Sequence, residues 1–336
     1  MIILLNTPKS YLEKLEILEL HKEYNLGGYL NNISFLEKNK NIKSLIISEF
    51  SFIKDYTPIS KLDKLEFLKL YHTDINSLLF LENCKNIKNL NLSYLYKKID
   101  DFTPISKLDK LETLIILKTN ICDISFLEKN KNIKHLELCR YHKEEHDLEI
   151  LDTYIKDYTP ISKLDNLEIL KICDNHIHNI SFLEKNINIK NLNLNKCFNI
   201  RHFSPISKLD KLEILNLDET NISDISFLEY NKNIKELLIS GTFKNHLKIS
   251  DYTPISKLEK LEILIIEYAN VKDITFLEKN KNIKKLDFFR CSNIEDFTPI
   301  SNLVNLEHLR LRYVKISDIS FLIKNKNIKK FRFRLF

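Results

Sequence analysis

Glycine is scarce in this sequence. Only three of the 336 residues are glycine, and all three, Gly27, Gly28 and Gly241, fall in insertions between regular segments. A phosphate-binding loop needs several glycines at fixed spacing, because its backbone must approach the phosphates closely. The sequence therefore contains no glycine-rich phosphate loop.

Long apolar runs are also missing. Met1 to Leu5 is apolar but too short for the core of a signal peptide or for a membrane span, and no later stretch could cross a bilayer. We therefore expect no membrane association and a cytoplasmic location, which for a viral protein means the host cytoplasm.

The six cysteines show no spacing typical of a disulfide framework. We expect reduced thiols, as in a cytosolic protein. The repeat register places Cys139 and Cys173 side by side on neighbouring strands. Two interpretations of this pair stay open, namely small half-polar fillers or a redox or metal role.

A catalytic or metal-binding constellation is not evident among the ten histidines. His142 and His146 have the spacing of one helical turn, beside Glu144, Glu145 and Asp147, but no third ligand is specified. A solvated charged loop is the first interpretation of this insertion, and a metal site is the alternative. We predict no enzyme activity, no cofactor and no metal.

The charge balance is mild. The chain has 52 basic and 46 acidic side chains, a formal net charge of +6. Such a balance permits nucleic-acid binding without indicating it.

Internal repetition is the strongest feature that the sequence does have. All seven prolines occupy one repeat position, and seven phenylalanines mark a second position, which follows the proline by 22 residues in six of the seven double repeats. About 14 single repeats of about 23 residues fill the chain. We predict one domain over residues 1–336, made of seven double repeats without a separate cap or linker.

Within each repeat the apolar pattern is Leu-x-x-Leu-x-x-Leu-x-Leu, as in the segment from Ile59 to Leu70. The chain resembles leucine-rich repeat proteins, and in particular the short 22-residue class of internalins and phosphatase-regulating repeat proteins. The segment Asn221–Ile225 is similar to the tail of that class. The resemblance implies an α/β repeat solenoid, a horseshoe or arc. It would have about 14 short parallel strands on its concave face and short helical or 3-10 segments on its convex face.

The sequence departs from this family at the buried asparagine that normally bonds the backbone of the neighbouring turn. Among the fourteen residues three positions after the last repeat leucine, only Asn175 is asparagine. Threonine and cysteine can replace part of its hydrogen bonding. We therefore expect no continuous asparagine ladder, and less uniform turns on that flank.

The convex segments carry signals of helix starts. A serine or threonine precedes every proline, as Thr57 precedes Pro58, which predicts an N-cap with proline at the first helical position. In the second half of each unit, pairs such as Ser125 and Glu128 predict capping boxes.

Charges alternate along the predicted strands. The residue after the Leu or Ile that opens each predicted strand is glutamate in one repeat and lysine in the next, over all fourteen repeats, from Glu16 and Lys43 to Glu307 and Lys329. Neighbouring strands lie about 4.8 Å apart, so the alternation turns repulsion into pairing. We expect this ladder to set register.

Two groups of outward-facing residues are candidate binding sites. The first lies on three successive strands of the N-terminal third and consists of Phe67, Lys69, Tyr71, Tyr94, Ile115 and Leu117. Exposed aromatic and aliphatic side chains in a concavity are typical of protein-binding anchors. Scattered surface apolar residues are the alternative interpretation.

The second group lies at outward positions of the last three strands and contains five of the seven arginines. Its members are Arg290, Arg310, Arg312, Arg332 and Arg334, with Tyr268, Phe289 and Tyr313 beside them. Register should place four of the arginines at the corners of one patch, where like charges repel. The patch either docks an acidic segment of a partner or protects an exposed sheet edge at residues 330–335.

These observations favour a non-enzymatic scaffold or adaptor that binds an unidentified protein through its concave face. Polyanion or nucleic-acid binding through the C-terminal arginines is the alternative. We expect a monomer or weak edge-to-edge self-association. The insertions at residues 21–32, 140–157 and 240–250 each follow a strand and should project from one flank.

Overall fold

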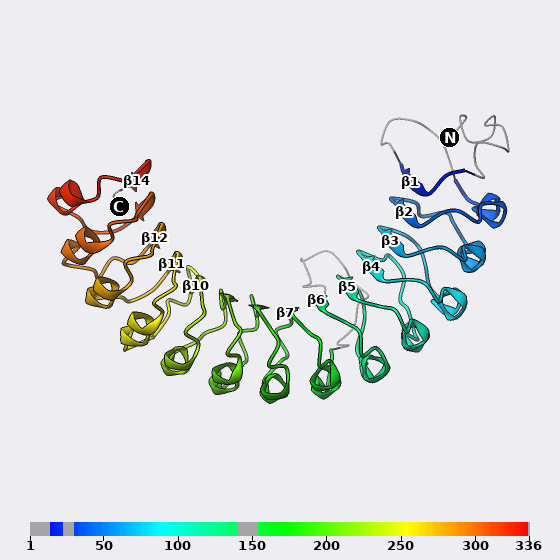
Figure 1. The fold of residues 1–336 in the computed structure, drawn as a ribbon, viewed down its shortest axis with the longest axis horizontal. Helices are drawn as coiled ribbons and strands as arrows, with labels where there is room; N and C mark the ends of the chain where they lie inside the picture. The colour runs from blue at the N-terminus through cyan, green and yellow to red at the C-terminus, as the bar shows by residue number, and fades with distance from the viewer. Residues whose placement is uncertain (1–13, 23–29, 140–153, 335–336) are drawn as a thin grey trace. The chain divides into compact units, whose positions relative to one another are not determined.

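A computed structural model describes residues 14–22, 30–139 and 154–334 of the chain. They divide into two compact units, Met1–Leu167 and Glu168–Phe336. Each unit alternates short strands with 3-10 segments of five residues (Figure 1). The single-domain organisation stays a prediction.

The described residues of the first unit form six strands and six 3-10 segments. They are β1 (Ile17–His21), η1 (Ser34–Lys38), β2 (Ser44–Ser48), η2 (Thr57–Lys61), β3 (Phe67–Tyr71), η3 (Leu79–Asn83), β4 (Asn89–Ser93), η4 (Thr103–Lys107), β5 (Thr113–Leu117), η5 (Ser125–Lys129), β6 (His135–Cys139) and η6 (Thr159–Lys163).

The second unit continues the same alternation. It contains β7 (Ile169–Cys173), η7 (Ser181–Lys185), β8 (Asn191–Asn193), η8 (Ser204–Lys208), β9 (Ile214–Asn216), η9 (Ser226–Tyr230), β10 (Glu236–Ser240), η10 (Thr253–Lys257), β11 (Ile263–Glu267), η11 (Thr275–Lys279), β12 (Lys285–Phe289), η12 (Thr298–Asn302), β13 (His308–Arg312), η13 (Ser320–Lys324) and β14 (Lys330–Arg334).

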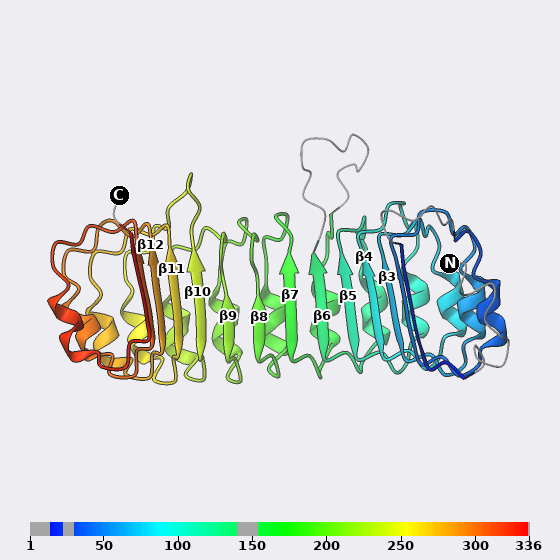
Figure 2. The ribbon, with the colours of Figure 1, turned by 90° about the horizontal axis from the view of Figure 1, so that it is seen from above.

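The strands of each unit form a parallel sheet in sequence order, β1 to β6 and β7 to β14. The second and fourth residues of a strand point into the core, as Leu68 and Leu70 do, and they pair with Leu90 and Leu92 of the next strand. The first, third and fifth residues face away from the core. In both units the strands lie on one side and the 3-10 segments on the other (Figures 1 and 2). The predicted fourteen parallel strands and 3-10 segments are confirmed.

Aromatic rings support the 3-10 side of the core. At four Thr-Pro or Ser-Pro segments the preceding aromatic residue packs near the phenylalanine of the next segment, as Phe203 does at 6.4 Å from Phe227 and Phe297 at 5.8 Å from Phe321. The phenylalanine that marks the second half of each double repeat is therefore a packing residue.

The predicted N-caps and capping boxes are wrong. Each 3-10 segment begins at the Ser or Thr itself when it has one, and the preceding residue, such as Tyr56 before η2, makes no side-chain capping bond. An Asp or Asn two residues upstream accepts the backbone N–H instead, as Asp55 does from Thr57 at 2.8 Å. Eleven of the thirteen segments start this way, so the hydroxyl is not needed as a cap.

An asparagine ladder is present, but at the end of the 3-10 segment rather than after the strand. Nδ2 of Asn231 donates to the carbonyls of Ile206 and Leu209 of the preceding repeat at 2.9 and 3.2 Å. The same two bonds are made by Asn130, Asn280 and Asn325. The ladder therefore serves every second repeat and satisfies buried carbonyls there.

At the position after the strand, cysteines replace asparagine in part, as expected. The thiols of Cys197 and Cys291 are buried and donate to the carbonyls of Ile172 and Ile266 at 3.2 and 3.4 Å. The expectation of six reduced thiols is wrong, because Cys139 and Cys173 are disulfide-bonded. Each is the half-buried last residue of a strand.

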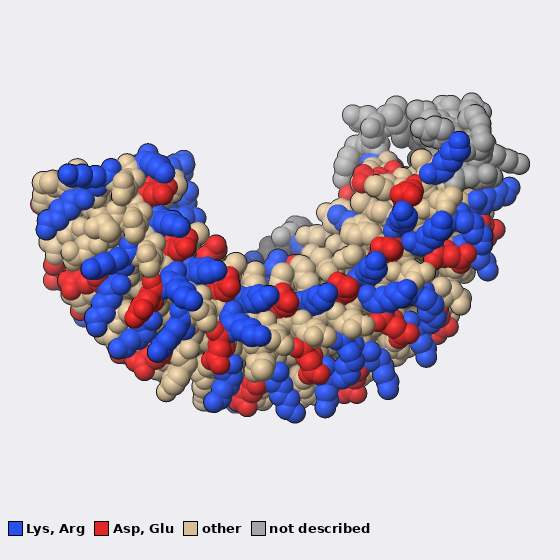
Figure 3. Space-filling view, in the orientation of Figure 1, with Lys and Arg blue, Asp and Glu red and all other residues tan. Residues whose placement is uncertain are grey.

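The predicted charge ladder is confirmed within each double repeat. Glutamate and the following lysine form ion pairs of 2.7 to 3.0 Å, among them Glu66 with Lys88 and Glu213 with Lys235. These pairs are solvent-exposed, so they add little stability and mainly fix register. Figure 3 shows basic and acidic side chains interspersed over the visible face of both units.

Most residues of two predicted insertions, including His142 and His146, lie outside the described ranges. The third insertion, after β10, projects from the edge at which the strands end (Figure 2). Within residues 14–22, 30–139 and 154–334, no helix has the length and apolar character needed to cross a membrane.

Replacing Asn231 by alanine should destabilise the second unit. Two buried carbonyls would lose their donor, at about 1–3 kcal/mol each. Urea unfolding of the variant and the parent measures this loss. Asn233→Ala is the control, because the 2.7 Å bond from Asn233 to the Asp210 carbonyl is solvent-exposed and water can replace it there. Equal losses in the two variants would contradict a special role for the buried ladder.

Candidate functional site

A left-handed turn ends nine of the strands at the same place. The sixth residue, counted from the start of the strand, has φ between +49° and +67°. Its backbone N–H donates to the carbonyl of the next strand, as Arg290 does to Arg312 at 2.9 Å, and the chain then leaves the sheet. The nine residues are Glu49, His72, Tyr94, Lys118, Lys196, Glu219, Tyr268, Arg290 and Tyr313.

The residue types at these turns oppose the backbone preference. Glycine, asparagine, aspartate and histidine enter the left-handed region most easily, whereas the residue types at the eight turns other than that of His72 lose roughly 1–2 kcal/mol there. None of the nine is Gly, Asn or Asp, and every one has a long or aromatic side chain. The chain therefore maintains backbone strain at a position where it presents large side chains, a combination typical of functional sites.

In the first unit these side chains touch in sequence. Nδ1 of His72 lies 3.2 Å from Oε1 of Glu49, and the His72 ring is 5.0 Å from that of Tyr94. The ammonium of Lys118 lies 4.9 Å from the Tyr94 ring. Tyr71 stacks on His72 at 4.3 Å and lies 5.2 Å from Tyr94. A continuous column of polar and aromatic groups results.

The structure divides the predicted first group, which consists of Phe67, Lys69, Tyr71, Tyr94, Ile115 and Leu117. The Lys69 ammonium lies 5.2 Å from the Tyr71 ring. Tyr71 and Tyr94 meet, although Tyr94 lies in a turn and not on a strand. Leu117 pairs with Ser93, which in turn pairs with Tyr71. Phe67 lies four residues before Tyr71 on β3, about 13 Å away along the strand. Ile115 aligns with Asn91 and belongs to neither end.

Sequence reasoning missed His72 and Tyr96, which complete the aromatic group. The His72 ring lies 5.4 Å from Tyr96, whose side chain is exposed. Both line an open hollow of about 530 Å³, together with Lys22, Glu49, Ser51 and Asp74. The sixth residue of each strand, which is Glu49, His72 and Tyr94 in consecutive repeats, could have pointed to His72. Tyr96 lies two residues beyond this position.

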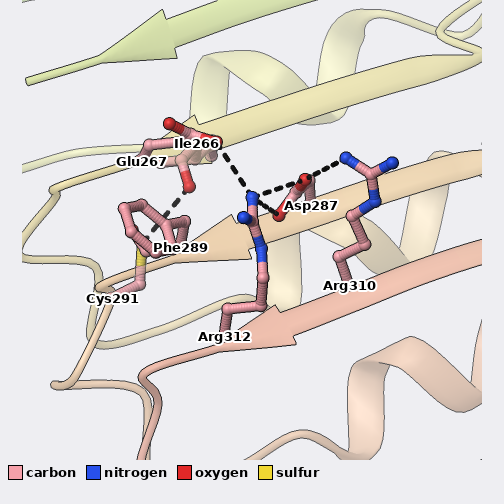
Figure 4. A network of polar contacts seen from close by, with 7 residues as sticks. All are labelled: Ile266, Glu267, Asp287, Phe289, Cys291, Arg310 and Arg312. Carbon is pink, nitrogen blue, oxygen red and sulfur yellow. Dashed lines mark hydrogen bonds and ion pairs between the residues drawn. The ribbon is translucent and has the colours of Figure 1, made fainter. Parts of the chain in front are cut away.

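In the second unit the predicted arginine patch is present, but two of its arginines have partners within the chain (Figure 4). Register aligns Arg310 with Arg332 and Arg312 with Arg334, as predicted. Arg310 and Arg312 lie 3.4 and 3.2 Å from the carboxylate of Asp287, which is only 1% exposed. Arg312 also lies 3.4 Å from Glu267 (Figure 4).

The expectation of an uncompensated four-arginine patch is therefore wrong for Arg310 and Arg312. A buried carboxylate needs charged partners, and removing them leaves an isolated buried charge at about 3–5 kcal/mol. Both arginines thus have a structural role. Within the described part of the chain, no carboxylate pairs with Arg290, Arg332 or Arg334, so these three carry the excess positive charge.

Arg290 lies in a left-handed turn after β12 and not on a strand, contrary to the sequence prediction. Its guanidinium carbon lies 4.9 to 5.8 Å from the centres of the Phe243, Tyr268, Phe289 and Tyr313 rings. We refer to this group as the arginine–aromatic cluster. It consists of Phe243, Tyr268, Phe289, Arg290, Arg312, Tyr313 and Arg334, since Arg312 stacks on Phe289 and Arg334 on Tyr313.

The insertion after β10 contributes Phe243 to this cluster. Gly241 starts the insertion, and a Cβ there would lie 2.6 and 2.7 Å from the carbonyl oxygens of Asn245 and Tyr268, so only glycine fits. The N–H of Leu247 donates to the Tyr268 carbonyl at 2.8 Å and fixes the loop to the turn. Phe243 is 69% exposed. The loop therefore holds a large apolar ring in solvent beside Arg290.

β14 is exposed along its whole length, in agreement with the predicted edge at residues 330–335 as far as Arg334. Phe331 and Phe333 on its core-facing side are also exposed. Among the described residues, no group of three or more His, Cys, Asp or Glu side chains could hold a metal ion.

Two carboxyl groups of the second unit have raised pKa values. Burial raises the pKa of Glu267, and the Asp287 carboxylate raises it further. Burial also raises the pKa of Asp218. By contrast, a hydrogen bond from Lys329 and its positive charge lower the pKa of exposed Glu307.

Several solved structures are similar to this one. The structure is similar to an internalin (inlF) of Listeria monocytogenes, with 24% identity and a TM-score of 0.63 over 88% of either chain. It is also similar to a leucine-rich repeat protein of Leptospira interrogans, with 15% identity and a TM-score of 0.67 over 97% of this chain and 85% of that chain.

A third similar structure is that of TLR13 in complex with ssRNA13, at 20% identity and a TM-score of 0.61. The match covers 89% of this chain and 48% of that chain, so this chain spans about half of its length. No family model and no curated protein matches the sequence.

The parallel strands, the 3-10 segments and these likenesses define the class: the chain has the leucine-rich repeat fold. At these identities the likeness extends to the fold alone. What the chain binds must be derived from its own side chains.

Replacing Glu267 by glutamine should change stability in a pH-dependent way. A carboxyl group whose pKa is raised by folding stabilises the protein below its ordinary pKa of 4.5 and loses that contribution as pH rises through the folded value. The variant should therefore gain stability relative to the parent between about pH 4 and about pH 7. Urea unfolding at both pH values measures the change.

Glu307→Gln is the control of opposite sign. Its lowered pKa means that ionised Glu307 stabilises the folded state above its ordinary pKa, so this variant should lose stability relative to the parent over the same pH range. A parallel response of the two variants would contradict the assignment.

Proposed function

We propose that this chain is a non-enzymatic interaction scaffold whose second unit binds an acidic segment of a partner protein through the arginine–aromatic cluster. The observation that carries this proposal is Arg290. Its guanidinium is surrounded by four rings and pairs with no described carboxylate.

Charge and shape both support an acidic partner. Arg290, Arg332 and Arg334 retain net positive charge that Asp287 and Glu267 do not neutralise. An arginine held by aromatic rings is pre-organised, so little side-chain entropy is lost when it binds a carboxylate. Exposed Phe243 adds an apolar anchor, and aromatic and arginine side chains are the residue types enriched at binding hot spots.

Single-stranded nucleic acid is the second candidate. Arginine beside exposed aromatic rings can bind phosphate and stack bases, and a protein with a similar fold forms a complex with ssRNA13. The mild net charge of +6 and the interspersed acidic side chains favour the acidic protein segment.

A synthetic peptide rich in glutamate with one aromatic residue tests the proposal, alongside a single-stranded oligonucleotide of equal charge. Arg332→Glu combined with Arg334→Glu should weaken peptide binding about tenfold or more, because two favourable charge pairs become repulsive. Both arginines lie on exposed β14 and hold no buried carboxylate, so the fold should be retained.

Arg201→Glu is the matched control, since Arg201 is exposed on the same unit away from the cluster. Calorimetry over a range of salt concentrations separates the candidates, because counterion release gives nucleic acid the steeper salt dependence. Peptide binding that is absent, or that Arg201→Glu weakens as much as the double variant does, would refute the proposal. Tighter binding of the oligonucleotide would favour the second candidate.

A further inference from the structure

In the second unit, the left-handed turns present a different set of side chains from the outward face of the strands. On that face, Arg310 and Arg312 are bound to Asp287, and the third residue of β11 is the aliphatic Ile265. Tyr268, Arg290 and Tyr313 occupy three consecutive turns, at the edge where the strands end. The guanidinium carbon of Arg290 lies 5.8 Å from the Tyr268 ring and 4.9 Å from the Tyr313 ring.

The inserted loop is attached to the same turns. The Gly241 N–H donates to the backbone carbonyl of Glu267 at 2.9 Å, and the Leu247 N–H donates to that of Tyr268, so both ends of the loop tip are fixed beside the turn residues. The Phe243 ring then lies 5.1 Å from the guanidinium carbon of Arg290. An irregular insertion has thus been placed over the turns and not over the strand face.

The first unit shows the same arrangement independently. Glu49, His72, Tyr94 and Lys118 occupy consecutive turns and contact one another in order. In both units the chain places large side chains where glycine, asparagine or aspartate would fit the backbone better. Such local conflicts between residue type and backbone are expected at functional positions.

We propose that the left-handed turn residues Tyr268, Arg290 and Tyr313 determine the affinity of the second unit for its acidic partner segment. The outward residues of the strands have a secondary role. This inference rests on the proposed function and narrows it to one row of residues. Arg290 binds the partner's carboxylates, the two tyrosines and Phe243 flank it, and Arg310 and Arg312 keep the sheet together beneath.

The backbone conformation provides a sharp test, because glycine removes the side chain and relieves the strain at the same time. Arg290→Gly and the double variant Tyr268→Gly/Tyr313→Gly should each weaken binding of the glutamate-rich aromatic peptide at least about tenfold. Their melting temperatures should equal or exceed that of the parent, since a residue with φ near +50° is replaced by one that prefers it.

Lys196→Gly is the matched control, because Lys196 has φ of 65° at the same turn position but lies outside the cluster. It should gain stability without losing affinity. Arg290→Lys keeps the charge but not the planar guanidinium, and it should bind between the parent and Arg290→Gly.

The outcomes separate this inference from the proposed function. If the glycine variants bind like the parent while the Arg332→Glu/Arg334→Glu variant loses binding, the proposed role of the turn residues is refuted and the acidic-partner proposal is retained. No binding of the peptide by the parent would overturn both. Loss of affinity together with a clearly lowered melting temperature in Arg290→Gly would assign the turn residues a structural role and overturn the inference.

Discussion

A single repeat of this chain cannot bury its own leucines, and the rest of the structure depends on that constraint. Each strand directs two apolar residues inward, and the next repeat covers them, as Leu90 and Leu92 lie beside Leu68 and Leu70. The backbone of a buried turn must also find partners, which the asparagines of alternate repeats supply. Because burial and hydrogen bonding both depend on the neighbouring repeat, the register between repeats is fixed within each unit.

Because the register is fixed, the residues at one position of successive repeats are aligned in a row. When every strand ends at the same position, one residue per repeat lies about 4.8 Å from its counterpart in the next. The left-handed turn makes this position costly for any large side chain. Large side chains at this position therefore indicate a function, whereas an exposed leucine elsewhere does not. The residue types found there are tyrosine, histidine, arginine, lysine and glutamate.

Register also decides which charges are available to a partner. Asp287 is buried beneath Arg310 and Arg312 and pairs with both, whereas Arg290 in the turn and Arg332 and Arg334 on β14 pair with no carboxylate in the described ranges. Similar residues thus have different roles within a few ångströms. The buried Asp287 carboxylate binds the two arginines that stabilise the sheet, and the other arginines stay available to a partner.

The sequence by itself determined the repeat, the fourteen strands, the 3-10 side and the alternating Glu–Lys pairs, because each depends on a periodicity that is visible in one dimension. It could not locate the asparagine ladder, the Asp-based starts of the 3-10 segments or the partner of Arg312, because these depend on which groups meet across repeats. Only the tertiary structure showed that Tyr94 and Arg290 lie in strained turns and that Phe243 reaches Arg290. The physical reason is that backbone dihedral angles and the path of an insertion are set by packing against neighbouring repeats, which the pattern of residue types does not encode.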